Sequence, residues 1–245
     1  MAPPARPADG RGGAAILRRY DQWTIRLEAD AVIRGQGMDP AAVRERSPRI
    51  VAAAEAAIGQ GRALLEPLVL ARELAITAHE ADRVVLEAGE LPCGPDIAAR
   101  LAPADRLIVV GATVGQTLDD HAIDSFSQDP MLALALHGVG SAAVEDLAEQ
   151  ACRHFRLEGR GDHRGCAILC WPGSAQWPNN LAQQQIFALL DPDGEAGDVI
   201  ELTTSRLIRP AKSLSFLVGL TAEPVSDAEA CDTCGLIPVC NFSGC

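Results

Sequence analysis

Lysine and aromatic residues are scarce in this 245-residue chain. Lys212 is its single lysine, among 21 basic and 33 acidic residues that give a formal net charge of -12. Nucleic acids and anionic membrane surfaces are bound by clustered basic side chains, so this balance argues against both kinds of partner. We attribute the scarcity of lysine to biased genomic composition and give Lys212 little functional weight.

Long hydrophobic runs are also missing. No stretch approaches the length of a membrane span, and residues 1–13 lack the apolar segment of a secretory signal. We therefore expect residues 1–13 to be a disordered leader and the protein to be cytoplasmic. Because 48% of the residues are hydrophobic and only 4% are aromatic, the core must be built from Ala, Leu, Val and Ile.

Helical patterns come first in the chain, and strands mixed with helices follow. Residues 23–74 are predicted to be helical, and Asp39-Pro40 and Asp129-Pro130 each combine a capping residue with proline at the first helical position. The second of these pairs opens the longest predicted helix, which runs to about Phe155. Five segments have the pattern of strands: 83–86, 106–111, 166–170, 199–203 and 213–220. This order favours an α+β fold.

The longest predicted helix carries one apolar stripe and two costly glycines. The stripe repeats at helical spacing and consists of Leu136, Gly140, Ala143, Leu147, Ala151 and Phe155. Gly138 and Gly140 each cost about 1 kcal/mol of helix stability relative to alanine. That cost indicates a close approach by backbone or by a ligand.

Half of the eight cysteines gather in a C-terminal tail with the spacing C-x2-C-x5-C-x4-C. Four thiolates at this spacing are typical of an iron–sulfur cluster or a zinc site, so Cys231, Cys234, Cys240 and Cys245 are the predicted metal ligands. A redox dithiol, or a tail in which Cys245 takes no part, are the alternatives. The remaining cysteines are expected to be core thiols, with Cys93 as a further candidate ligand. We divide the chain into a leader (1–13), one domain (14–225) and the tail (226–245).

Several blocks between about Ala31 and Leu220 resemble the activation domain of cobalamin-dependent methionine synthase and its stand-alone relatives. The blocks, in order, are AVIRGQG (31–37), IVVGATVG (108–115), GSAAVEDLAE (140–149), Pro172-Gly173 with Trp177-Pro178, and LTTS (202–205) with Pro210 and Ser213. That family implies an α+β domain with a twisted, mostly antiparallel sheet. It binds S-adenosylmethionine and offers the methyl group to cobalamin of a partner while the cobalt is reduced.

The resemblance implies a ligand site formed by Glu145, Pro172, Gly173, Ser174 and Ser205. Three positions depart from the family pattern: Leu169 replaces its arginine, Ser174 its tyrosine and Thr204 its glutamate. A leucine cannot replace the forked contact of arginine with a carboxylate, so we hypothesise that S-adenosylmethionine binding is weakened or lost. His121 follows the start of the DxHxxG cobalt-ligand signature, but Asp124 stands where its glycine belongs, so any cobalamin would be carried by a partner.

Three functions remain open at this point. The first is a stand-alone activation component that supports a corrinoid-dependent methyltransferase through S-adenosylmethionine. The second is a partner of a corrinoid protein, or an iron–sulfur electron-transfer accessory, that has lost S-adenosylmethionine binding. The third is a structural subunit of a methyl-transfer assembly. Whether the chain itself is an enzyme stays undecided.

Overall fold

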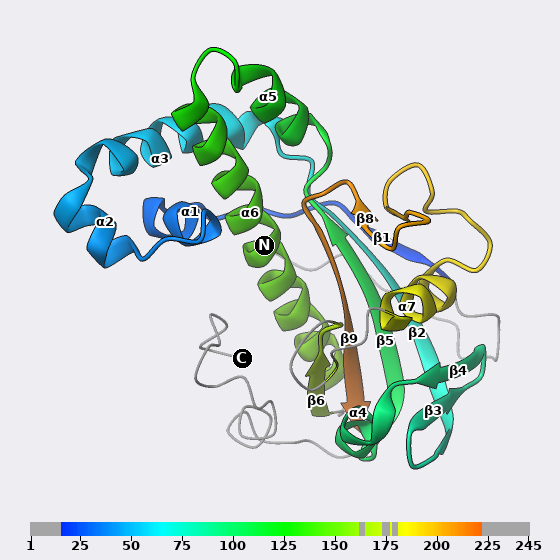
Figure 1. The fold of residues 1–245 in the computed structure, drawn as a ribbon. Coiled ribbons are helices and arrows are strands. Elements are labelled where there is room, and N and C mark those ends of the chain that lie inside the picture. The colour runs from blue at the N-terminus through cyan, green and yellow to red at the C-terminus, as the bar shows by residue number, and fades with distance from the viewer. Residues whose placement is uncertain (1–15, 162–164, 173–176, 178–180, 222–245) are drawn as a thin grey trace.

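The fold is built on one antiparallel sheet (Figure 1). The computed structural model describes residues 16–161, 165–172, 177 and 181–221. Within these residues the seven-stranded sheet has the order β4-β3-β2-β5-β9-β6, with β1 also paired to β2, and every pairing is antiparallel. Its strands are β1 (Arg18–Tyr20), β2 (Leu68–His79), β3 (Arg83–Leu86), β4 (Gly89–Pro92), β5 (Ala104–Thr113), β6 (Gly165–Cys170) and β9 (Ser213–Thr221). A separate hairpin pairs β7 (Glu201–Leu202) with β8 (Ile208–Arg209).

Helices lie on both faces of this sheet, which confirms the predicted α+β class. The N-terminal helices, as predicted, precede most of the sheet. They are α1 (Ala29–Gly35), α2 (Pro40–Arg46), α3 (Pro48–Gly61) and the short 3-10 turn η1 (Arg62–Leu64). The later helices are α4 (Gly94–Leu101), α5 (Thr117–Ser125), α6 (Pro130–Gly161) and α7 (Leu181–Leu190).

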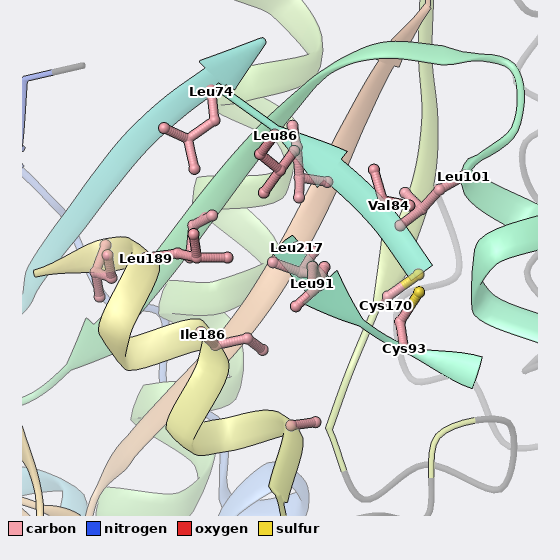
Figure 2. Packing of buried hydrophobic residues seen from close by; sticks show 14 of the residues in the cluster. Leu74, Val84, Leu86, Leu91, Cys93, Leu101, Cys170, Ile186, Leu189 and Leu217 are labelled. Atoms are coloured by element: carbon pink, nitrogen blue, oxygen red, sulfur yellow. The ribbon is translucent and has the colours of Figure 1, made fainter. Parts of the chain in front are cut away.

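Side chains alternate between the two faces of each strand, so the sheet has two separate cores. On one face, Leu70, Leu107 and Leu217 pack with residues of α4 and α7. On the other face, Val69, Val110 and Phe216 pack with the C-terminal part of α6. The close view of the first core shows Ile186 and Leu189 of α7 beside Leu217 and Leu91 (Figure 2).

Three of the cysteines predicted to be core thiols are buried. Cys93 and Cys170 belong to the core under α4 and α7, and their sulfur atoms point toward one another (Figure 2). Cys152 belongs to the core under α6. Burial raises the pKa of the Cys93 thiol to about 11, so the thiolate that a metal requires is disfavoured there.

Helix α6 is the central helix of the fold and has the predicted cap. Asp129 Oδ1 accepts hydrogen bonds from the backbone N–H groups of Met131 (3.1 Å) and Leu132 (3.0 Å). The predicted apolar stripe from Leu136 to Phe155 is buried, but the helix continues beyond Phe155 to Gly161. Contrary to the sequence expectation, α6 is long and apolar enough to cross a membrane. Since 61% of its apolar window is buried inside the fold, it has the character of a core helix in a soluble domain.

The sequence prediction fails at the start of the sheet. The Asp39 side chain caps α2 by accepting from the N–H of Ala41 at 3.0 Å, as predicted. The expected helical segment over 23–74 is wrong at both ends. Residues 23–28 are not helical, and β2 begins at Leu68 and pairs with β5 over eight residue positions. Pairing on both sides and burial outweigh the helix propensity of its Ala, Leu, Glu and Arg residues.

Candidate functional site

Helices α1 and α6 approach so closely that only glycine fits between them. A Cβ atom on Gly138 would lie 2.5 Å from the carbonyl oxygen of Val32, and one on Gly35 would lie 2.7 Å from the carbonyl oxygen of Gly138. Real Cβ contacts are not this short, so neither position has room for a side chain and both need glycine. The predicted close approach at Gly138 is therefore to backbone, and it fixes α1 against the middle of α6.

Gly140 makes room for a different neighbour, the side chain of Lys212. A Cβ atom there would lie 2.8 Å from Cγ and 3.0 Å from Cε of Lys212. Lys212 stands between β8 and β9, and its aliphatic stem lies across the helix at this glycine. The single lysine of the chain is only 6% exposed. Such burial is rare for lysine, so composition does not account for its placement here.

The ammonium group of Lys212 is held by two side chains of α6. Its Nζ donates to Ser141 Oγ at 2.9 Å and lies 3.1 Å from His137 Nε2. Asp119 of α5 is also buried nearby, with an exposed fraction of 8%, and acts on Lys212 through its charge. Among the residues that the structure describes, the Oδ2 atom of Asp119 has no hydrogen-bond partner. We refer to Asp119, His137, Ser141 and Lys212 as the lysine cluster.

Burial dominates the titration of the lysine cluster. It lowers the pKa of Lys212, against the opposing charges of Asp119 and Glu145, and it also lowers the pKa of His137. Burial raises the pKa of Asp119, although the positive charges of Lys212 and His137 act in the other direction. All three shifts favour the neutral forms, as expected for ionisable groups withdrawn from water.

Glu145, the acidic residue of the predicted ligand site, lies next to this cluster. His137, Ser141 and Glu145 are spaced by four residues on α6 and so share one face of the helix. Glu145 itself is exposed. Partial desolvation nevertheless raises its pKa, while the charges of Arg34 and Lys212 act to lower it. The carboxylate thus lies in the field of one cation from α1 and one from the start of β9.

In the described part of the chain, no hydrogen bond or ion pair joins Glu145 to the other predicted ligand residues. Pro172 is half-buried just after β6, beside Trp171, whose ring stacks on Phe216 at 4.6 Å between centroids. Ser205 is exposed in the β7–β8 turn, where its Oγ lies 3.1 Å from Thr203 Oγ1. Gly173 and Ser174 lie outside the described residues. Leu169 is on β6, paired with Val218 of β9.

The predicted metal ligands Cys231, Cys234, Cys240 and Cys245 also lie outside the described residues. Within the residues that are described, no group of three or more His, Cys, Asp and Glu side chains is arranged to hold a metal ion. A shallow hollow between β2 and the loop after α7 is lined by Ile16, Arg72 and Asp191, among others. It includes none of the predicted site residues.

Sequence reasoning proposed Glu145, which stays a prediction, and it missed the lysine cluster. Its members come from α5, α6 and the loop before β9, and Lys212 is separated from His137 by 75 positions. Only one signal pointed to them, which was the pair of costly glycines in the longest helix. Gly140 is explained by the Lys212 side chain, a neighbour that the sequence pattern alone does not identify.

Comparison with known proteins gives a fold but no family. No protein-family profile and no curated protein matches the sequence. Among solved structures, the chain is similar to the MetH reactivation domain bound to AdoHcy. The two align with a TM-score of 0.58 over 87% of this chain and 80% of that domain, at 14% sequence identity. At this identity the likeness establishes an activation-domain-like fold and nothing about ligands.

Proposed function

We propose that this protein is a cytoplasmic, stand-alone activation-domain-like component that binds S-adenosylmethionine or its product and supports a corrinoid-dependent methyltransferase. The observation that carries the proposal is the fold, which matches a reactivation domain bound to AdoHcy over most of this chain. When bound, S-adenosylmethionine would supply a methyl group, and the corrinoid would belong to a partner protein. In this proposal the chain supplies binding and orientation.

The surroundings of Glu145 support a ligand site at this point of the fold. The side chain is exposed, so a ligand can reach it, and it lies on α6, which packs against α1, α3, α5 and the sheet. Rigid support of this kind keeps a binding group in one position. The carboxylate suits a cationic group such as the amino group or the sulfonium of S-adenosylmethionine.

The first test is calorimetric titration of S-adenosylmethionine into the anaerobically purified full chain and into Glu145→Gln. A hydrogen bond to a charged group contributes about 1.5–3 kcal/mol, so we expect the variant to bind at least about tenfold more weakly. Glu149→Gln is the matched control, since Glu149 stands one turn further along α6 and pairs with Arg153. Equal affinity of Glu145→Gln and the unaltered chain would refute the site.

A second function, an iron–sulfur electron-transfer accessory, is favoured by the four clustered tail cysteines and by Leu169 in place of the family's arginine. Iron and acid-labile sulfide in anaerobic protein, with visible absorbance that bleaches on reduction, would support it. Colourless protein that contains only zinc or no metal, together with S-adenosylmethionine binding, would leave the first proposal alone.

A further inference from the structure

Arg34 and Glu145 are exposed side chains of opposite charge on the two packed helices α1 and α6. Arg34 is exposed near the end of α1, and its charge acts on the carboxylate of Glu145. In the described part of the chain, the two side chains share no hydrogen bond and no direct ion pair. An exposed guanidinium and an exposed carboxylate that are close but unpaired are both available to a ligand.

The relative position of these two groups is set by backbone packing. Arg34 precedes Gly35, and a Cβ atom on Gly35 would lie 3.0 Å from the Cβ of Ser141, one turn before Glu145. The contact between Gly35 and Gly138 holds the two helices in this register. Because the helices are in backbone contact, the positions on α1 and α6 that carry the two side chains are held in a fixed relation.

Lys212 is a second, buried cation whose charge acts on Glu145. Its Nζ is bound to Ser141, and its positive charge acts on Glu145 from within the fold. Lys212 is too buried to be the main contact of a ligand, while Arg34 is open to solvent. Arg34 is therefore the cation that a ligand on Glu145 can reach.

We propose that Arg34 and Glu145 together bind the amino-acid part of a ligand, with the ligand's carboxylate on the Arg34 guanidinium and its ammonium on the Glu145 carboxylate. This inference rests on the proposed function and specifies which part of the ligand is recognised. Arginine presents a planar fork that matches the two oxygens of a carboxylate, and a carboxylate accepts from ammonium. Arg34 would thus supply the carboxylate contact that Leu169 cannot make.

The test compares two ligands that differ in the carboxylate. Affinities of S-adenosylmethionine and of decarboxylated S-adenosylmethionine are measured by calorimetry for the unaltered full chain, for Arg34→Gln and for Arg46→Gln. We expect the unaltered chain to prefer the ligand with the carboxylate by at least tenfold. Arg34→Gln is expected to bind both ligands equally, whereas Arg46→Gln, with an arginine that is 78% exposed on α2, keeps the preference.

The outcomes separate this inference from the proposed function. If the unaltered chain binds neither ligand, the proposed function fails. If it binds both but Arg34→Gln keeps the tenfold preference, or if no preference exists at the start, only the assignment of Arg34 is overturned. Circular dichroism and thermal unfolding of each variant establish that it is folded, and a merely structural role of Arg34 would weaken both ligands alike.

Discussion

The two halves of helix α6 have different surroundings, although they belong to one continuous helix. The N-terminal half packs against other helices: Leu136, Val139 and Ala142 join a core with α1, α3 and α5. The C-terminal half packs on the sheet, where Leu147, Ala151 and Phe155 join the strand residues of the second core. Of the polar groups of the candidate site, His137 and Ser141 lie on the first half and Glu145 lies at the junction, while Lys212 packs against the first half from outside the helix.

The half of α6 on the sheet stabilises the fold, whereas the half on the helices carries groups of the candidate site. The half that lies on the sheet buries apolar side chains at helical spacing, which stabilises the fold. The half that packs on helices has Gly138 and Gly140, which make room for the backbone of α1 and for the side chain of Lys212. Three substitutions test this difference: one in each half of α6 and one in the neighbouring helix α5.

The largest effect is expected at Phe155, in the apolar half. Its side chain is 1% exposed and meets the ring of Tyr20 edge to face, with 5.7 Å between ring centroids. Truncating a buried phenylalanine leaves a cavity, so Phe155→Ala should lower the free energy of unfolding by about 3–5 kcal/mol. Chemical denaturation measures it, with Leu157→Ala, 60% exposed on the same helix, as the control. Similar losses in the two variants would contradict the packing described.

A smaller loss is expected at the junction with α1. Gly138→Ala places a methyl group 2.5 Å from the carbonyl oxygen of Val32, so one helix must move, and overpacking of this kind costs about 1–3 kcal/mol. The matched control is Gly59→Ala in α3, where no atom lies within 4 Å of the new Cβ. There the helix propensity of alanine should raise stability by up to about 1 kcal/mol. Thermal unfolding measures both changes: we expect a lower melting temperature for Gly138→Ala and a higher one for Gly59→Ala. A melting temperature of Gly138→Ala that equals or exceeds that of the unaltered chain would contradict the close approach.

The same helix shows how far sequence alone reaches. The stripe from Leu136 to Phe155 and the cap at Asp129 could be predicted, because both depend only on residues that are close together in the sequence. Strand β2 could not be predicted, because its identity depends on pairing with β5. The paired residues are 33 positions apart at Leu74–Leu107 and 45 positions apart at Leu68–Thr113.

The candidate site was likewise only half predictable. Glu145 was found through its resemblance to a family block, and the structure leaves that assignment as a proposal. Lys212 was set aside as a product of composition, since a lone lysine carries no pattern. Its burial, and its contacts with residues more than 70 positions away, exist only in the folded chain.

The smallest effect is expected from pH, at the lysine cluster. Burial raises the pKa of Asp119 above its ordinary value, and the charged groups that face it are Lys212, His137 and Asp120. A folded-state pKa above the unfolded value means that ionisation of Asp119 costs stability as pH rises through that range and that the cost is complete above the folded pKa. Asp119→Asn cannot ionise, so it should match the unaltered chain at acidic pH and gain relative stability toward neutral pH.

This gain should be smaller than the losses at Phe155 and Gly138, because Lys212 already offsets part of the cost. Denaturation of both proteins between acidic and neutral pH measures it, with Asp124→Asn, exposed on the same helix, as the control. Stability curves of Asp119→Asn and the unaltered chain that run parallel across this range would show that Asp119 ionises without cost. The lysine cluster would then be an ordinary ion network rather than a set of groups whose ionisation costs stability, and the contrast between the two halves of α6 would be one of packing alone.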